Sequence, residues 1–238
     1  GERLVDEGVG KVVRRREKET VAGEDLARQL LKVAETLVLQ MAELADAAEK
    51  TWGNALYACF DQKVEEKFLA LYKKHLVKML GRNPLKNENY VHMVNEKHFD
   101  RVMGLMDPEK VVYGGKGDRE TLRIEPTIMR NVTADDAVMK EEIFGPVLPV
   151  ITYETIEEAI AFINARPHPL ACYLFTSDKK TEKRFLTAVP FGGGCINDTI
   201  IHLATSHMGF GGVGNSGMGS YHGKKSLETF SIVNCHFS

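Results

Sequence analysis

Four cysteines supply the thiols with which this chain of 238 residues could do covalent chemistry. They are Cys59, Cys172, Cys195 and Cys235, and each lies far from the others along the chain. A zinc site or a disulfide framework needs closely spaced pairs such as Cys-x-x-Cys, and this sequence has none. We therefore expect no metal site, and free thiols in a reducing compartment: the cytoplasm or, as the alternative, the mitochondrial matrix.

Glycine is concentrated in two segments near the C-terminus, FGGGCIND at 191–198 and GFGGVGNSGMG at 209–219. The second segment has the composition of a phosphate-binding loop. However, such a loop ends in Lys-Ser/Thr and opens a helix, whereas Gly219 is followed by Ser-Tyr-His-Gly-Lys-Lys. These glycines favour tight turns beside a pocket, and a merely flexible loop is the alternative interpretation.

Composition and charge exclude two broad classes of protein. Lys and Arg total 31 against 33 Asp and Glu, so there is no basic excess to hold nucleic-acid phosphates. The longest apolar stretches, such as 147–153 and 170–176, are far shorter than the roughly 18 apolar residues of a transmembrane helix. The chain begins at Gly1 without a charged-then-apolar leader, so we expect no secretory signal.

Two parts of the chain differ in pattern, with a change near residue 50. Between residues 24 and 50, apolar residues recur every three or four positions, which predicts one long amphipathic helix or two short ones. The apolar stripe indicates core packing, and docking on another subunit is the alternative. We therefore divide the chain into a helical lead-in at 1–50 and a second region at 51–238.

The first half of the second region predicts two helices and short extended segments. Apolar residues share one face of 62–80, and Gly81 supplies a stop, which predicts a helix there. A second helix is expected to open within 95–101. A short strand at 110–113 precedes Gly114-Gly115, and 123–132 is expected to be extended.

The second half alternates strands and helices. Strands are expected at 147–153, 170–176 and 193–196, with helices starting at Thr155 and at Ser177 or Asp178. A βαβαβ order implies a largely parallel sheet with helices packed on it. We expect the three strands to be neighbours in one sheet.

Several motifs in the second region resemble the aldehyde dehydrogenase superfamily, most closely its class 3 type, which acts on fatty and aromatic aldehydes. They are Glu141-Glu-Ile-Phe-Gly-Pro146, Ile124-Glu-Pro-Thr-Ile, and the segment from Gly209 to Ser231. The resemblance runs from about Asp61 to Phe230. It implies an α/β fold, a three-layer catalytic domain with a largely parallel sheet and helices on both faces. Residues 1–50 are weakly similar to the end of the family's cofactor domain.

The resemblance also implies an activity. The family oxidises an aldehyde to a carboxylic acid with NAD or NADP, through a cysteine thiohemiacetal and thioester. We expect a small aldehyde as substrate, weak cofactor binding by this chain alone, and a homo-oligomer or a place in a larger assembly. The rival interpretation is a non-catalytic structural or regulatory subunit that keeps the scaffold. A third interpretation is an incomplete or locally mistraced sequence of a normal enzyme.

The family's site residues transfer to this chain by motif. Glu142 matches the carboxylate that holds the nicotinamide ribose hydroxyls, and Phe144 matches the ring that packs beside the nicotinamide. Phe210 matches the substrate-side Phe of a Pro-Phe-Gly-Gly turn, although Gly209 replaces the Pro. His202 falls where the class 3 type also has a histidine, and a structural role is expected for it.

The nucleophile can be aligned in two ways. In the first, Asn54, Ala55 and Cys59 match the family's Asn-Ala-Gly-Gln-Thr-Cys loop, and Cys59 is the catalytic thiol. In the second, Tyr57 to Asp61 matches the strand after that loop, and Cys59 is an ordinary strand residue. Cys195 is a less favoured nucleophile. The general base aligns with Gln40, which cannot take a proton at neutral pH, and Glu43 is a possible substitute.

Overall fold

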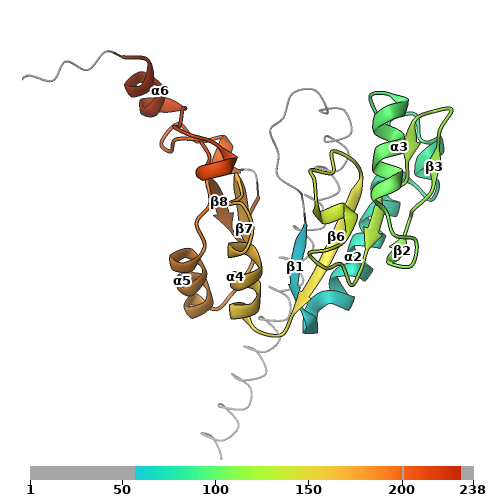
Figure 1. The fold of residues 1–238 in the computed structure, drawn as a ribbon, viewed down its shortest axis with the longest axis horizontal. Helices are drawn as coiled ribbons and strands as arrows, with labels where there is room; N and C mark the ends of the chain where they lie inside the picture. Colours follow the sequence, from blue (N-terminus) through green and yellow to red (C-terminus); the bar gives the residue numbers. More distant parts are fainter. Residues whose placement is uncertain (1–56, 200, 232–238) are drawn as a thin grey trace, which may run out of the picture.

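The computed structural model describes residues 57–199 and 201–231, in which strands and helices alternate in an α/β arrangement (Figure 1). The predicted helix within 24–50, the base candidates Gln40 and Glu43, and Cys235 lie outside the described residues. Among the described helices, none is both long and apolar enough to cross a bilayer.

A four-stranded sheet organises the first half of the described chain. Its order is β1 (Ala58–Asp61), β6 (Val147–Tyr153), β5 (Thr127–Met129) and β2 (Val111–Tyr113). β1 and β5 both run parallel to β6, and β2 runs antiparallel to β5. The strand predicted at 110–113 is confirmed as β2, and the predominantly parallel character of the sheet is confirmed as well.

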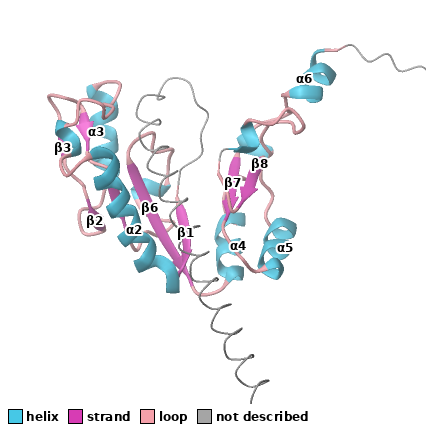
Figure 2. Cartoon of the chain, turned by 180° about the vertical axis from the view of Figure 1, so that it is seen from behind, coloured by secondary structure: helices cyan, strands magenta, loops and turns pink. Residues whose placement is uncertain are grey.

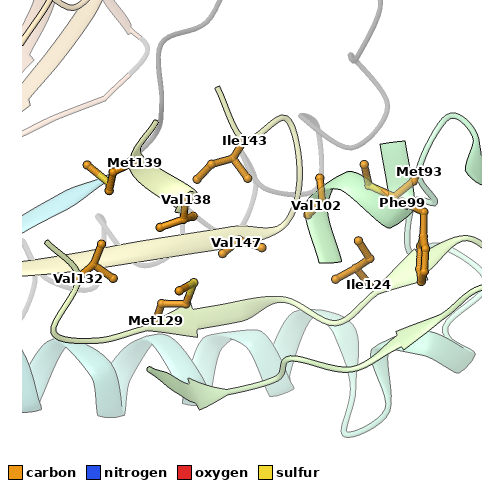
Figure 3. Close-up of a cluster of buried hydrophobic side chains, with 10 residues drawn as sticks. All are labelled: Met93, Phe99, Val102, Ile124, Met129, Val132, Val138, Met139, Ile143 and Val147. Atoms are coloured by element: carbon orange, nitrogen blue, oxygen red, sulfur yellow. The ribbon is translucent and has the colours of Figure 1, made fainter. Parts of the chain in front are cut away.

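Helices cover both faces of this sheet, as a three-layer domain requires. Helix α2 (Gln62–Leu80) packs on one face, where its buried Phe68 and Tyr72 meet Leu148 of β6. Helix α3 (Glu96–Leu105) packs on the other, where Val102 and Val147 share a cluster of buried side chains (Figure 3). The neighbours Val147 and Leu148 therefore face opposite layers, as alternation along a strand demands.

Local signals explain where these two helices begin and end. The side chain of Asp61 accepts a hydrogen bond from the Lys63 N–H at 2.9 Å, and Gly81 closes α2 with φ of 81°. Asn95 caps α3 by accepting from the His98 N–H at 2.9 Å. Capping side chains satisfy the first free N–H groups of a helix, and glycine takes the left-handed φ without strain. The predicted bounds of α2 are confirmed.

The second half of the chain forms a separate parallel pair of strands. β7 (Ala171–Leu174) pairs with β8 (Gly193–Ile196), and α4 (Ile156–Asn164) and α5 (Lys179–Ala188) pack on the pair. Figures 1 and 2 both show these four elements grouped away from α2 and α3. Thr155 caps α4, and Asp178 caps α5. The βαβαβ order is thus confirmed.

One expectation about this half is wrong. The segments 147–153, 170–176 and 193–196 are not neighbours in one sheet, because β6 belongs to the four-stranded sheet and β7 and β8 form a two-stranded sheet of their own. The reason is that both edges of β6 are already occupied, one by β1 and the other by β5. No edge of β6 is left for β7 to pair with.

The two halves meet through aromatic and cationic contacts beside β1. The ring of Tyr57 meets Phe162 of α4 edge to face, with centroids 5.7 Å apart. The guanidinium of Arg166 lies 4.7 Å from the centroid of Phe162 and donates from Nη1 to the Met139 carbonyl at 3.3 Å. The C-terminal end of α4 is therefore tied to the four-stranded half.

The remaining elements are short. β3 (Gly117–Asp118) and β4 (Arg123–Ile124) form an antiparallel pair, so the predicted extended segment 123–132 is split between β4 and β5. Single-turn 3-10 helices occupy 84–86, 137–139, 201–203 and 214–216. Helix α6 (Gly223–Phe230) lies beyond β7 and β8 in both views (Figure 2).

Candidate functional site

The segment 141–146 enters β6 as a loop that Arg101 of α3 holds in place. The guanidinium Nη1 donates to the Glu142 carbonyl at 3.1 Å, and Nη2 donates to the Ile143 carbonyl at 2.6 Å. The same Nη1 also pairs with the Glu141 carboxylate at 3.1 Å. Because a guanidinium presents its donors in a rigid fork, one side chain fixes three consecutive residues of the loop.

Packing against α3 and its neighbours also fixes the loop. Ile143 is buried beside Val102 and Val138 above β6 (Figure 3). Gly145 lies so close to α3 that a Cβ atom there would be 2.8 Å from Val102 Cγ1. Only glycine fits such a close approach without displacing its neighbour.

Between these two anchored positions, the backbone of Phe144 has φ of 43°. This left-handed conformation is unfavourable for a bulky residue and persists only where its surroundings hold it. The ring is half-buried and belongs to none of the three hydrophobic core clusters. The loop thus holds an aromatic ring outside the core in a strained conformation, which is typical of a ligand-binding position.

Glu142 has no partner for its carboxylate among the described residues. Within the part of the chain that the structure describes, its side chain makes no hydrogen bond or ion pair, in contrast to Glu141, which pairs with Arg101. Burial raises the pKa of Glu142, because nearby protein excludes water without supplying donors. A half-buried carboxylate of this kind is suited to accept hydrogen bonds from the hydroxyl groups of a ligand.

Cys59 lies in the middle of β1, where it faces Ile151 of β6 in register. Burial, followed by the nearby Cys172 thiol, raises the pKa of Cys59 to about 12, and Arg166 offsets only part of the effect. A thiol with so high a pKa is almost fully protonated at neutral pH, and the thiolate is the nucleophilic form. The strand position is the one that the second alignment predicts.

Phe210 lies in a cluster of aromatic rings. Its backbone pairs with that of Tyr221 through two hydrogen bonds of 2.7 and 2.9 Å, which bring the two rings to a centroid distance of 5.6 Å. His222 stacks on the same ring at 5.8 Å, and His202 lies at 6.3 Å. The glycine-rich segment therefore folds back on itself and presents Phe210 within an aromatic surface.

Two contacts of the structure have no local signal in the sequence. Arg101 was placed within a helix-opening motif, but its partners lie 41 and 42 residues away, so no local pattern indicates them. Cys195 and His202 were considered separately, yet the structure pairs them, with Sγ 3.8 Å from Nδ1. A strand followed by a 3-10 turn makes that seven-residue separation close in space.

The structure does not bring all the sequence-predicted residues together. Glu142 and Phe144 share one loop, Phe210 belongs to the aromatic cluster, and Cys59 lies on β1. Among the described residues, no hydrogen bond, ion pair or ring contact joins any two of these three groups. Each group is therefore a partial site.

Comparison with known proteins gives a consistent result for most of the chain. Residues 54–235 match the profile described as "Aldehyde dehydrogenase family". The chain is 46% identical over 175 residues to "Aldehyde dehydrogenase, dimeric NADP-preferring" of Canis lupus familiaris. This alignment covers 74% of this chain and 39% of the relative. It is 44% identical over 177 residues to "4,4'-diaponeurosporen-aldehyde dehydrogenase" of Staphylococcus aureus, with the same two coverages.

A solved structure extends the similarity to the fold. The structure titled "Substrate bound state of Staphylococcus Aureus AldH" superposes with a TM-score of 0.74 at 38% sequence identity. The superposition covers 87% of this chain and 47% of that chain. The present chain thus spans less than half the length of these relatives.

Proposed function

Because the chain belongs to the aldehyde dehydrogenase family, we propose that the protein acts in the NAD- or NADP-dependent oxidation of an aldehyde to a carboxylic acid. Residues 141–146 are then its nicotinamide-side loop. The observation that carries this proposal is the carboxylate of Glu142, which has no partner in the described part of the chain, on a loop fixed by Arg101. A rigid loop keeps such an acceptor aimed at its ligand before the ligand arrives.

The proposal gives a role to two residues of the loop and to three residues outside it. Glu142 accepts hydrogen bonds from the two ribose hydroxyls, and Phe144 packs its ring beside the nicotinamide. Arg101 and Val102 hold the loop from α3. When bound, the nicotinamide supplies the acceptor for the hydride that leaves the aldehyde. Phe210 contributes an aromatic wall at the substrate side.

We propose that Cys59 is a structural residue of β1 and not the nucleophile. Its thiol lies in a paired strand, and burial raises its pKa to about 12. The family reaction needs a thiolate to attack the aldehyde carbonyl, and nothing in the described surroundings of Cys59 stabilises one beyond the partial effect of Arg166.

The strand position and the raised pKa of Cys59 also support a second candidate function, a non-catalytic subunit that keeps the scaffold. Apolar side chains near the C-terminus favour assembly with a partner, because Met218 is 96% exposed and Phe230 is 84% exposed. The dog relative is named as dimeric. A homo-oligomer or a larger assembly is therefore proposed under either function, with the cytoplasm as location and the mitochondrial matrix as the alternative.

Nucleotide titration of the chain and of two neighbouring variants tests the nicotinamide-side loop. Binding of NADH or NADPH, followed by nucleotide fluorescence, is expected to be saturable but weaker than micromolar. Glu142→Gln should weaken it by about tenfold, since hydrogen bonds to a charged acceptor contribute about 1.5–3 kcal/mol and about 1.4 kcal/mol corresponds to tenfold.

Glu141→Gln is the matched control, because Glu141 is the adjacent carboxylate and pairs with Arg101. Its affinity for nucleotide should stay close to that of the unmodified chain. Equal affinities of the Glu142→Gln variant and the unmodified chain would refute the assignment of the loop, and so would the absence of saturable binding.

A further inference from the structure

The two-stranded sheet has one face that α4 and α5 cover and one that they do not. Cys172, Leu174 and Ile196 point into the cluster formed with those helices. Tyr173 and Cys195 are register partners on the alternate positions, so they share the opposite face. On that face the ring of His202 lies 5.6 Å from the ring of Tyr173.

A thiol and an imidazole form a pair on this face. Cys195 Sγ lies 3.8 Å from His202 Nδ1, within hydrogen-bond distance for sulfur. The histidine is only 8% exposed, and burial lowers its pKa, so the ring stays neutral and able to accept a proton at neutral pH. This arrangement of a thiol against a base is the one that activates a cysteine nucleophile.

His202 carries a second, independent indication of a ligand. Its Nε2 atom is buried and has no hydrogen-bond partner among the described residues. With Nδ1 acting as the base, Nε2 carries the proton and is a donor without an acceptor. Buried donors are normally satisfied, because an unmet one costs free energy. A ligand that brings a carbonyl oxygen would supply the missing acceptor.

The surroundings of the pair select for an apolar ligand. Tyr173 lies on one side of the imidazole, and Phe210 lies 6.3 Å from it, itself packed against Tyr221. Aromatic rings offer a hydrocarbon chain a large apolar contact surface. The combination of a soft nucleophile, a polar donor and aromatic walls matches a molecule with a conjugated carbonyl group and an alkyl tail.

The other described thiols provide a contrast within the same chain. Burial raises the pKa of Cys59 to about 12 and that of Cys172 to about 11. Neither thiol has a hydrogen bond to the imidazole of a described histidine, whereas Cys195 does. Among the described cysteines, Cys195 is therefore the one with a base to remove its proton.

We propose that Cys195 is a site of covalent attachment for α,β-unsaturated aldehydes, with His202 as the base that accepts the thiol proton. This goes beyond the proposed function: it shares Phe210 as an aromatic wall, but it involves neither the nicotinamide-side loop nor Cys59. The chain can bind a reactive aldehyde in this way whether or not it oxidises one.

The step is a conjugate addition that balances without an oxidant. The S–H bond of Cys195 breaks, and its proton passes to His202 Nδ1. The sulfur electron pair forms a C–S bond at the β-carbon of the alkenal, while the C=C electrons move to give an enolate. The imidazolium then returns the proton to the α-carbon. The product is a thioether that keeps the aldehyde group, and its mass is the sum of the two reactants.

Peptide mapping after exposure to trans-2-hexenal tests the proposal. The full chain is incubated with the alkenal, reduced with borohydride to fix the adduct, digested, and analysed by mass spectrometry. Cys195 should be labelled about tenfold or more faster than Cys59 and Cys172, because burial raises the pKa of those two thiols to about 12 and about 11, and each pKa unit lowers the thiolate fraction about tenfold. Saturated hexanal should leave no stable adduct on Cys195. Cys235 is measured on its own peptide and does not enter the comparison.

Two histidine variants separate activation from simple exposure of the thiol. His202→Asn should slow labelling of Cys195 about tenfold, whereas His207→Asn, at an exposed position of the same segment, should leave it unchanged. Equal labelling of the three thiols, or undiminished labelling of Cys195 in a folded His202→Asn variant, would overturn the proposal. If that variant does not fold, the comparison among the three thiols of the unmodified chain decides alone.

Discussion

The guanidinium of Arg101 donates a 2.6 Å hydrogen bond to the carbonyl oxygen of Ile143, a residue 42 positions further along the chain. This bond connects α3 to the loop that presents Glu142 and Phe144. The same side chain also reaches the Glu142 carbonyl and the Glu141 carboxylate. We therefore propose Arg101 as a positioning residue, which acts on the proposed nicotinamide site through the backbone of the loop.

Replacement of Arg101 by alanine should loosen the loop more than it disturbs the rest of the fold. Hydrogen bonds that involve a charged group contribute about 1.5–3 kcal/mol, and two carbonyls lose their donor. Hydrogen exchange of the amides at 141–145 should rise, and NADH affinity should fall with it. Arg119→Ala is the matched control, because Arg119 is an exposed arginine that pairs with Glu96 and Asp100 of the same helix. Loop exchange that is no faster in Arg101→Ala than in Arg119→Ala would contradict this role.

Two glycines near α3 should respond to alanine with opposite signs. At Gly145 a Cβ atom would be 2.8 Å from Val102 Cγ1, so Gly145→Ala should lower the free energy of unfolding by about 1–3 kcal/mol through overpacking. At Gly104, within α3, nothing lies within 4 Å of the added atom, and the helical backbone should gain about 0.5–1 kcal/mol. Urea denaturation measures both. A destabilised Gly104→Ala, or a neutral Gly145→Ala, would show that the packing around α3 is misassigned.

Asp136 should make the free energy of unfolding depend on pH in the acidic range. Its carboxylate accepts from Lys110 Nζ at 2.6 Å and from the Thr133 N–H at 2.6 Å, and these bonds, with that from Lys110 the larger cause, lower the pKa of Asp136. The unfolded chain has a pKa of about 3.9 at such a group. The stabilisation is therefore complete above about pH 4 and is lost as the pH falls through the lower folded pKa.

The measurement for Asp136 is urea denaturation across the acid range. Asp136→Asn should lower stability at neutral pH and flatten its decline below about pH 4. Asp135→Asn is the control, because the side chain of Asp135 is 95% exposed. Parallel acid profiles for Asp136→Asn and the unmodified chain would rule out this linkage.

The sequence was sufficient to predict those helices and strands whose bounds are set by residues within the segment itself. The bounds of α2 follow from apolar spacing, the cap at Asp61 and the stop at Gly81, all of which lie within the segment itself. The pairing of β6 could not be predicted in the same way. An apolar run identifies a strand, but which edges of that strand are occupied depends on β1 and β5, which come from distant parts of the chain.

The same distinction applies to the candidate site: residues of a contiguous motif could be predicted, and contacts between distant segments could not. Glu142 and Phe144 could be selected because they belong to a contiguous motif, and the structure shows them on a single fixed loop. The role of Arg101 and the pairing of Cys195 with His202 depend on contacts made through the fold. For Cys59, the sequence left two alignments open, and only the pairing of β1 with β6 distinguishes a strand residue from a loop nucleophile.

We propose that this chain holds a nicotinamide-side loop in place while Cys59 remains a protonated strand thiol. Formation of NADH or NADPH by the purified chain tests it most directly, with short aliphatic, long aliphatic and aromatic aldehydes supplied alongside NAD or NADP, and with Cys59→Ala in parallel. We predict no turnover that depends on Cys59, because a thiol with a pKa of about 12 supplies almost no thiolate at neutral pH. Turnover in the unmodified chain that disappears in Cys59→Ala would contradict the proposal that Cys59 is a structural strand residue, and would establish Cys59 as the nucleophile.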